Sequence, residues 1–362
     1  MHIYELDTPA LVVDLDKVDR NLKRMAEYCR DHQLDLRPHT KTHKIPLLAK
    51  KQLSHGAIGL TVAKLGEAEV MVEAGFDHLL IAYPIVGELK ARRLGALCER
   101  SDIAVSVDSF ESVEFIRKGV RERGAKAGIL VEVDVGFGRC GVQDARDALA
   151  LARSVMDADC LEFRGLFFYP GSYLTQEGQK EQLSKINAFL ERLLDTFQTH
   201  GIPVRTVSGG STPTARFSHR FSGLTEIRPG TYIFNDRNTM LQGVAEEEDC
   251  AAVVLVTVVS KAVPGQVIVD GGSKTFSSDP CVAGHTGFGL IKGDPEAVFA
   301  AMNEEHGFID ISRSTRHYSI GDKLAIIPNH ICATVNLQND IFFSRNETVE
   351  SVCPVAARGK LR

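Results

Sequence analysis

Residues 36–44, LRPHTKTHK, form a short strand-like run that ends in a basic, imidazole-rich turn. Two lysines and two histidines within six residues are typical of a solvated surface loop, which is the first interpretation. The second is that Lys41 ends a strand and presents its amine to a site built from other strand ends. The surrounding sequence decides which interpretation has structural support.

Strand-like and helix-like segments alternate on the C-terminal side of this run. The strand-like segments are 34–41, 57–63, 78–84, 102–107, 127–135, 161–169, 204–208 and 225–229. The helix-like segments are 45–54, 65–74, 87–100, 109–120, 143–156 and 177–200, with a short helix from Pro213. Strands joined by helices of this length pair in parallel. Eight such units predict an α/β fold with an eight-stranded (β/α)8 TIM-type barrel.

The two ends of the chain follow a different pattern. A strand over 8–14 precedes a helix over 15–32, whose apolar residues recur at helical spacing. After residue 240, strands are expected at 251–260, 266–269, 324–328 and 332–337 without long helices between them. The sequence therefore predicts a barrel domain, residues 16–240, and a mainly antiparallel β domain made of residues 1–15 and 241–362.

Composition excludes several classes of protein. The 362 residues are 44% hydrophobic and 25% charged, which is ordinary for a globular enzyme. A net charge of −5 without long single-sign runs indicates neither a nucleic-acid nor a membrane partner. No signal peptide and no apolar run of about 18 residues is present, which predicts a cytoplasmic protein. Eight cysteines without CxxC spacing indicate reduced thiols.

In a barrel of this kind the working residues lie at the C-terminal ends of the strands. All the unusual sequence falls there: Lys41 after the first strand, Tyr169 at the end of the sixth, and three motifs. The motifs are VEVDVGFGRCGV with Asp134, Gly136 and Arg139, SGGST at 208–212, and PGTYIFND at 229–236. One rim of the barrel therefore gathers the candidate site.

Each residue of this rim has two interpretations, one as a catalytic or ligand-binding group and one as an ordinary surface or loop residue. Lys41 is a candidate amine nucleophile if neighbouring cations or burial lower its pKa, and otherwise a surface lysine. The turn at 209–212 offers backbone N–H groups and hydroxyls to a phosphate, although glycine is common in loops. Gly230 and Thr231 could complete that cradle. Arg139 is equally compatible with an ion pair at the rim.

His330 and Cys332 lie two positions apart in a strand-like run, PNHICATVNL, so both side chains are expected on one face. Imidazole and thiolate suit zinc, and two protein ligands would leave positions open for water and substrate. A lone His-x-Cys pair is also a common coincidence. The pair is a candidate metal site whose support comes from the rest of the chain.

Taken together, these motifs resemble the D-serine dehydratase and D-threonine aldolase family, pyridoxal 5'-phosphate (PLP) enzymes related to alanine racemase. The resemblance covers nearly the whole chain, in the family order: TPALVVDLD, RPHTKTHK, DVGFGRCGV, SGGST, RPGTYIFND and PNHICATVNL. It implies a barrel with a β domain, a metal-dependent lyase and a homodimer.

The resemblance also implies a role for each site residue. Lys41 would be the Schiff-base lysine, Arg139 would lie near the cofactor ring, and Tyr169 would line the ring pocket. The residues expected to hold the phosphate are Gly210, Ser211, Thr212, Gly230 and Thr231. His330 and Cys332 match the metal ligands of the family; the thiolate favours zinc, with manganese or magnesium as alternatives.

The reaction that the resemblance implies is cleavage of a β-hydroxy-D-amino acid. Dehydratases of the family look like His-x-Cys at the metal site, whereas the aldolases tend toward His-x-Asp. Cys332 therefore favours a dehydratase that converts D-serine or D-threo-3-hydroxyaspartate to a 2-oxo acid and ammonia. The alternatives are a D-threonine aldolase that yields glycine and an aldehyde, a racemase, and a non-catalytic PLP-binding protein.

Overall fold

The computed structural model of the chain describes residues 1–171, 179–282 and 284–362. These residues form two compact units. The barrel unit comprises residues 25–41, 46–230 and 360–362, and the sheet unit comprises residues 1–24, 42–45 and 231–359. No helix in the described part of the chain is long and apolar enough to cross a membrane.

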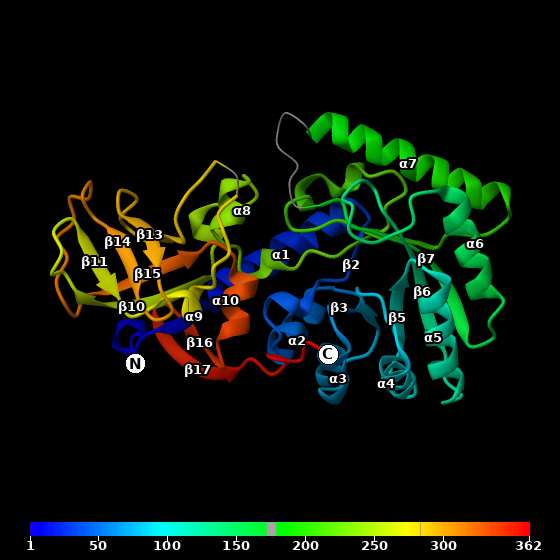
Figure 1. Cartoon of the computed structure of the whole chain (residues 1–362), viewed down its shortest axis with the longest axis horizontal. Coiled ribbons are helices and arrows are strands. Elements are labelled where there is room, and N and C mark those ends of the chain that lie inside the picture. Colours follow the sequence, from blue (N-terminus) through cyan, green and yellow to red (C-terminus); the bar gives the residue numbers. More distant parts are fainter. Residues whose placement is uncertain (172–178, 283) are drawn as a thin grey trace. The chain divides into compact units, whose positions relative to one another are not determined.

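Eight parallel strands form the centre of the barrel unit (Figure 1). They are β2 (Asp35–Leu36), β3 (Leu60–Val62), β4 (Leu79–Ile81), β5 (Ile103–Val107), β6 (Ala127–Val133), β7 (Leu161–Phe168), β8 (Thr206–Gly209) and β9 (Glu226–Ile227). Their order is β2-β9-β8-β7-β6-β5-β4-β3. The ring closes because Ile58 N–H donates to Leu36 O at 2.9 Å and Thr61 N–H to Pro38 O at 2.8 Å. The predicted barrel is therefore confirmed.

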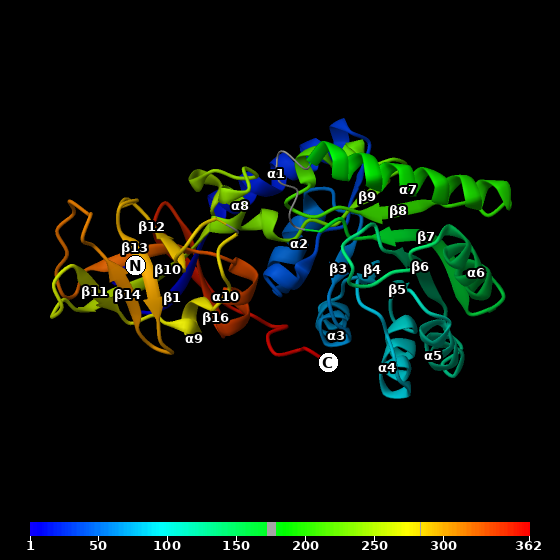
Figure 2. The ribbon, with the colours of Figure 1, turned by 45° about the horizontal axis from the view of Figure 1, so that its top comes forward.

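Helices cover the outside of these strands, as Figure 2 shows for α3 to α7. The helices are α1 (Leu15–Asp31), α2 (Pro46–Ser54), α3 (Leu65–Glu73), α4 (Glu88–Cys98), α5 (Phe110–Arg121), α6 (Ala145–Met156), α7 (Gln179–Thr199) and the 3-10 helices η2 (Thr40–Thr42) and η3 (Ala215–Arg220). The helix predicted over residues 177–200 has its expected start, Glu177, outside the described residues.

Burial explains why these segments become strands. Every residue of β5 and β6 is buried, because one face packs on helices and the other points into the barrel. Inside the barrel, four apolar side chains from successive strands pack together: Leu80, Ala104, Leu130 and Phe167. The strands are thus fixed on both faces, which gives the loops at their ends a rigid support.

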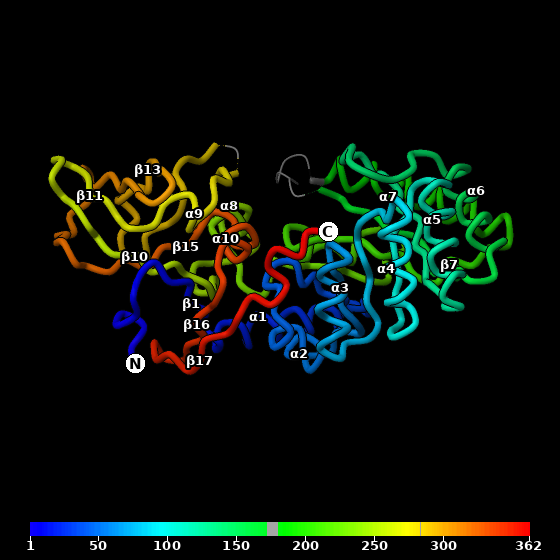
Figure 3. Tube along the Cα trace, turned by 60° about the horizontal axis from the view of Figure 1, so that its bottom comes forward, coloured from blue at the N-terminus to red at the C-terminus, as the bar shows by residue number. Residues whose placement is uncertain are grey.

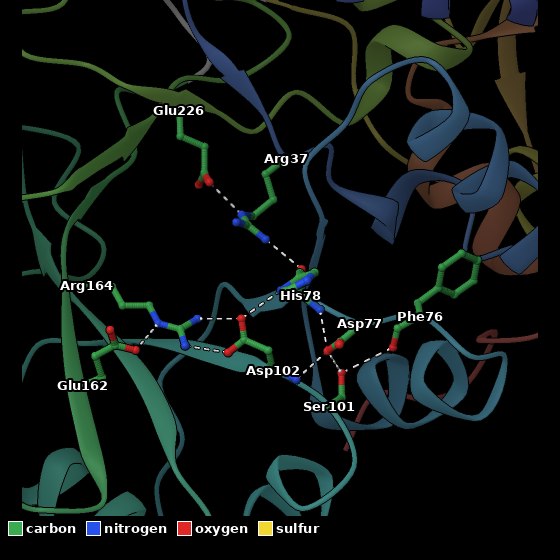
Figure 4. A network of polar contacts seen from close by, with 9 residues as sticks. All are labelled: Arg37, Phe76, Asp77, His78, Ser101, Asp102, Glu162, Arg164 and Glu226. Carbon is green, nitrogen blue, oxygen red and sulfur yellow. Dashed lines mark hydrogen bonds and ion pairs between the residues drawn. The ribbon is translucent and has the colours of Figure 1, made fainter.

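A polar network closes the N-terminal end of the barrel (Figure 4). Arg164 Nη2 donates to Asp102 Oδ1 at 2.5 Å, and Arg164 Nε donates to Glu162 Oε2 at 3.0 Å. His78 Nδ1 lies 3.0 Å from Asp102 Oδ2. Because this end is opposite to the strand ends that carry the unusual motifs, we interpret the network as structural.

The sheet unit is built on a mainly antiparallel sheet. Its strands are β1 (Ala10–Asp14), β10 (Ala252–Ser260), β11 (Gln266–Val269), β12 (Gly289–Ile291), β13 (Val298–Met302), β14 (Gly307–Asp310), β15 (Lys323–Pro328), β16 (Asp340–Arg345) and β17 (Thr348–Pro354). Strand β1 lies between β10, its antiparallel neighbour, and β16, its parallel neighbour. Figure 3 shows the N-terminus beside β17, where Ile3 N–H donates to Glu347 O.

Short helices complete the sheet unit. They are η1 (Ile3–Glu5), η4 (Thr231–Ile233), α8 (Arg237–Leu241), η5 (Glu247–Asp249), α9 (Ser273–Phe276) and α10 (Ile331–Leu337). The strand expected over residues 332–337 is therefore wrong, because this segment is helix α10. A segment of only six residues, CATVNL, fits either structure, and Asp236 favours the helix by accepting the N–H of Ile331 at its first turn.

The first barrel strand is also shorter than expected. The run at 34–41 pairs as a regular strand only over β2 and then turns into η2. Pro38 lacks an N–H, so the ladder cannot continue through it in the usual way. All eight cysteines are free thiols, as predicted.

Candidate active site

Lys41 lies in η2, directly after the first barrel strand, and its side chain is exposed. The turn is anchored because Thr40 Oγ1 donates to Thr61 O at 3.1 Å, and Lys41 N–H donates to His39 Nδ1 at 3.4 Å. Within the described residues, no carboxylate pairs with the Lys41 ammonium. The amine thus lies at a fixed strand end without an ion pair among the described residues, but it is exposed, so burial, one of the two conditions for a nucleophile, is not met.

Arg139 and Tyr169 come together at the ends of two neighbouring strands. The guanidinium carbon of Arg139 lies 4.5 Å from the centroid of the Tyr169 ring, and Phe137 packs edge-on against Tyr169 at 5.0 Å. The loop that carries Arg139 is shaped by Asp134, whose carboxylate accepts the N–H groups of Phe137 and Gly138. The loop after β6 therefore presents a cation stacked on aromatic rings.

The glycines of the two predicted phosphate loops follow neighbouring strands, β8 and β9. Gly210 has a φ of +78°, and a Cβ there would lie 3.0 Å from Ser218 Oγ, so glycine suits this turn. Gly210 and Gly230 are buried, yet across 1–171, 179–282 and 284–362 neither N–H finds an acceptor. Buried N–H groups without a partner are rare, and here they fit an anion such as a phosphate.

Ser211 and Thr212 occupy the same turn after β8. Both are buried, and Ser211 N–H donates to Thr214 Oγ1 at 2.9 Å. Thr214 is held in turn by Ser218, which donates its hydroxyl to Thr214 O at 2.9 Å. The turn is therefore rigid before any ligand binds, which favours a preformed cradle.

Arg228 links the C-terminal ends of β7 and β8, and the sequence analysis did not identify it. Its guanidinium donates to Ser208 Oγ at 2.6 Å and to Phe168 O at 2.8 Å, and it lies 3.6 Å from the Phe167 ring centroid. Its own N–H donates to Gly209 O. Burial lowers the pKa of Arg228 to about 10. An arginine one residue before Pro229 in the RPGTYIFND motif was the signal available in the sequence.

His330 and Cys332 are in contact, although α10 is not the strand that suggested the pairing. His330 is the extended N-cap residue of α10, and Cys332 follows in its first turn. The pKa of His330 is raised to about 11, because the charge of Cys332 favours the imidazolium and Asp236 adds a hydrogen bond. The N-cap geometry thus brings the side chains of His330 and Cys332 together, which the alternation of a strand was expected to do.

Two threonine hydroxyls surround the sulfur of Cys332. Thr42 Oγ1 lies 3.2 Å and Thr231 Oγ1 3.6 Å from Cys332 Sγ. Thr42 directly follows Lys41 in the chain. The side chain of Thr231, expected to hold a phosphate, thus contacts the thiol instead, which leaves its backbone N–H as the group available to an anion.

Asp236 is the second residue that sequence reasoning missed. Its side chain is 1% exposed, and its Oδ2 lies 3.2 Å from His330 Nδ1. A carboxylate on one imidazole nitrogen leaves the other nitrogen to a metal, the usual arrangement around histidine ligands. Asp236 also caps α8 by accepting Thr239 N–H, and an Asp followed three residues later by Thr is the capping signal in the sequence.

The donor set fits a metal with two protein ligands. Imidazole and thiolate in contact, with the imidazole oriented by a buried carboxylate, suit a thiophilic divalent ion such as zinc. No group of three or more His, Cys, Asp or Glu arranged to hold a metal is found in the described part of the chain. A metal held by His330 and Cys332 alone would keep open positions, as a catalytic ion does.

Two family models match this chain. The model of the alanine racemase N-terminal domain matches residues 13–238, and that of the serine dehydratase domain matches residues 251–344. This chain belongs to the alanine racemase-like family. Within the family, a D-threonine aldolase of Arthrobacter sp. is 35% identical over 98% of this chain and 93% of its own length.

Members of the family with other named activities are nearly as similar. A D-threo-3-hydroxyaspartate dehydratase of Delftia sp. is 33% identical, covering 91% of this chain and 92% of the relative. The crystal structure of a D-threonine aldolase from Filomicrobium marinum superposes with a TM-score of 0.92 at 30% identity, covering 99% of this chain and 98% of that one. Two solved variants of a D-threo-3-hydroxyaspartate dehydratase replace a histidine and, two positions later, a cysteine by alanine, and the cysteine variant is described as metal-free.

Proposed function

We propose that this chain is a PLP- and metal-dependent lyase that acts on β-hydroxy-D-amino acids, with dehydration as its reaction. The observation that carries the proposal is the contact of His330 with Cys332, oriented by Asp236. Support also comes from the relatives, whose names are D-threonine aldolase, 3-hydroxy-D-aspartate aldolase, D-threo-3-hydroxyaspartate dehydratase and D-serine dehydratase. All of these substrates are D-amino acids with a β-hydroxyl group.

The cofactor proposal assigns a task to each rim residue. Lys41 would bind the cofactor aldehyde through its amine, Arg139 would lie near the ring, Tyr169 would line the ring pocket, and the phosphate would be held by Gly210, Ser211, Thr212, Gly230 and Thr231. When bound, PLP supplies an electron sink for negative charge that develops at the substrate Cα. Lys41, once released, takes the proton from Cα as a general base.

The metal proposal assigns His330 and Cys332 as ligands. A divalent ion there supplies Lewis acidity toward the β-hydroxyl, which makes hydroxide a better leaving group. Thr42 and Thr231 place their hydroxyls on the Cys332 sulfur, and hydrogen bonds to a thiolate favour its charged form. Zinc is the first choice because of the thiolate, with manganese and magnesium as alternatives.

Dehydration is our first choice because the chain has His-x-Cys, the same spacing as the residues replaced in the solved variants of a D-threo-3-hydroxyaspartate dehydratase. Retro-aldol cleavage is the second candidate, supported by the 35% identity to the Arthrobacter D-threonine aldolase. The two reactions need the same cofactor and metal. They differ in whether the hydroxyl leaves or loses its proton.

Product analysis distinguishes the two reactions. Purified protein with PLP and zinc is incubated with D-serine, D-threonine and D-threo-3-hydroxyaspartate, and ammonia, 2-oxo acid, glycine and aldehyde are measured. We expect ammonia and a 2-oxo acid in equal amounts. Glycine and aldehyde without ammonia would reject dehydration in favour of the aldolase, and a change in optical rotation without cleavage would indicate a racemase.

Reduction by borohydride tests the attachment site. Treatment of the holoenzyme followed by peptide mapping is expected to label Lys41. Lys44 is the matched control, because its ammonium donates to Asn336 Oδ1 at 2.8 Å and has a structural partner. Label on Lys44, on another lysine or on none would contradict the proposal.

Removing one metal ligand tests the metal. Cys332→Ala and chelator treatment are each expected to abolish turnover while the visible absorbance of the bound cofactor persists. Cys353→Ala, in the edge strand β17, is the control and should remain active. Full activity of Cys332→Ala and of chelated enzyme would remove the metal from the mechanism.

We also propose a functional division of the chain, a homodimer and a cytoplasmic location. The barrel domain, residues 16–240, would bind the cofactor, and the β domain, residues 1–15 and 241–362, would bind the metal. Sedimentation velocity of the purified protein is expected to give twice the mass of 39.6 kDa. A monomer that turns over substrate would reject the dimer.

A further inference from the structure

Lys64 follows the strand next to the one that carries Lys41. His39 and Thr61 form a parallel bridge, and Thr61 N–H donates to Pro38 O at 2.8 Å. Lys41 and Lys64 follow the two bridged residues within a few positions, at the C-terminal ends of β2 and β3. Both lysines therefore belong to the rim where barrel enzymes bind their substrates.

The Lys64 side chain has a defined position. Its Nζ lies 3.3 Å from the centroid of the Tyr83 ring, which comes from the loop after β4. The backbone beside it is fixed because Ala63 N–H donates to Oε2 of the buried Glu67 at 2.7 Å. The ammonium is thus held between two strand ends, half-buried, and not free to sweep over the surface.

Lys64 has no counter-charge among the residues that the structure describes. Among residues 1–171, 179–282 and 284–362, no carboxylate forms an ion pair with it. An aromatic face attracts a cation but accepts none of the three ammonium N–H groups in the way an oxygen does. The Lys64 ammonium can therefore still donate hydrogen bonds to an anion.

Three other cations of the rim loops are already bonded within the protein or assigned to the cofactor. Arg228 is buried and donates to Ser208 and to the carbonyl of Phe168. Arg139 is stacked on Tyr169, beside the proposed cofactor ring, and Lys41 is the proposed nucleophile. Every amino acid substrate carries an α-carboxylate whose charge persists through the reaction, and Lys64 is a described cation of the rim that can receive it.

We propose that Lys64, held on the face of Tyr83, binds the α-carboxylate of the substrate. The proposal rests on the proposed function, since it assigns the charge that every amino acid of that class shares. It makes Lys64 a substrate-binding residue whose partner disappears when the carboxylate is replaced by a neutral amide.

The test compares acid and amide substrates in matched variants. The kcat/KM of D-serine and of D-serinamide, and of the D-threonine pair, is measured for the unmodified holoenzyme, Lys64→Met, Lys64→Arg and Lys90→Met, an exposed lysine of α4. A charged hydrogen bond lost from a binding site lowers the rate constant about 10–100-fold. We expect that loss for the acids in Lys64→Met, mainly through KM, and nearly unchanged values for the amides.

Binding of D-alanine gives a readout without turnover. It has the carboxylate but no β-hydroxyl, and its effect on the absorbance of the bound cofactor reports its Kd. We expect a weaker Kd in Lys64→Met, a nearly normal one in Lys64→Arg, and an unchanged one in Lys90→Met.

Three outcomes would overturn the assignment. The first is an equal loss of acid and amide turnover in Lys64→Met, which is the mark of a structural residue. The second is an unchanged preference of Lys64→Met for the acid over the amide, and the third is normal binding of D-alanine by this variant. An unmodified protein that cleaves no β-hydroxy-D-amino acid rejects the proposed function itself and the assignment with it, which is distinguishable because no variant is needed to see it.

Discussion

Oδ2 of Asp236 contacts two groups at once, His330 Nδ1 and the N–H of Ile331, and the side chain is almost fully buried. The carboxylate therefore fixes the imidazole while it caps α10. A carboxylate behind a histidine ligand both orients the ring and raises its basicity, and its loss typically weakens metal binding 10–100-fold.

We expect Asp236→Asn to weaken zinc binding about 10–100-fold while the fold is retained, because the amide still accepts a hydrogen bond. Competition with a fluorescent chelator measures the affinity directly, without any need for turnover. Asp279→Asn, which lies outside the pair, is the control. Unchanged zinc affinity in Asp236→Asn would show that the carboxylate only caps the helix.

Glu132 is an acid inside the barrel, 3% exposed. Burial raises its pKa, and the nearby guanidinium groups of Arg139 and Arg228 offset this only in part. A carboxyl group with a raised folded-state pKa costs stability wherever it is ionised in the folded chain. That cost disappears as the pH falls below the pKa of the same carboxyl group in the unfolded chain, about 4–5.

We expect Glu132→Gln to raise the Tm at pH 8 and to lose this advantage toward pH 5.

Asp77→Asn is the opposite case, because the N–H of Asp102 and other groups lower the pKa of Asp77. Its ionised form contributes stability above the ordinary carboxyl pKa, so Asp77→Asn should lower the Tm at pH 8, with less effect in acid. Calorimetry at both pH values checks the two signs, and equal signs would refute the assignment.

Helices α4 and α5 approach each other closely along two glycines. A Cβ at Gly119 would lie 2.2 Å from the carbonyl oxygen of Ala91, and one at Gly95 would lie 2.2 Å from the carbonyl oxygen of Gly119. Glycine normally weakens a helix by about 1 kcal/mol relative to alanine. Here the close backbone contact outweighs that penalty.

We expect Gly119→Ala to destabilise the protein by about 1–3 kcal/mol, because backbone atoms on the facing helix must move. Glu111→Ala, on the exposed start of α5, is the control and should change little. Thermal unfolding followed by circular dichroism measures both. A stabilised Gly119→Ala would mean that helix propensity decides and that the two helices separate easily.

At the scale of elements, periodicity predicted the long segments and failed on the short ones. Helices such as α1 and α7 bury a continuous apolar stripe, so their sequence alone identifies them. The six residues of 332–337 fit a strand or a helix equally well. A carboxylate 95 positions away, Asp236, provides the cap that makes them helix α10. Such long-range partners are not visible in local periodicity.

The barrel as a whole separates its structural end from its working end. Arg164 joins Asp102 and Glu162 at the N-terminal end (Figure 4), whereas the candidate cofactor residues follow the C-terminal ends of the strands. The side chains of Arg164 and Asp102 are about one-third exposed and that of Glu162 is 51% exposed, so solvent screens their charges in part.

We expect Arg164→Met to lower the free energy of unfolding by about 1 kcal/mol, since two carboxylates lose their shared partner. The kcat/KM of the folded enzyme should be unchanged. Lys185→Met, whose pair with Glu181 is largely exposed, is the control and should unfold normally. A loss of activity at full stability would show that the network acts on the site.

The sequence by itself determined the barrel, because eight strand and helix units with this spacing have one common way to bury their apolar faces. It also placed the candidate residues on one rim, since parallel strands all end there. Only the tertiary structure decided the roles of Arg228 and Asp236, because their partners come from other elements. It also decided how His330 meets Cys332, through a helix cap rather than a strand, since capping depends on a distant carboxylate that no local pattern contains.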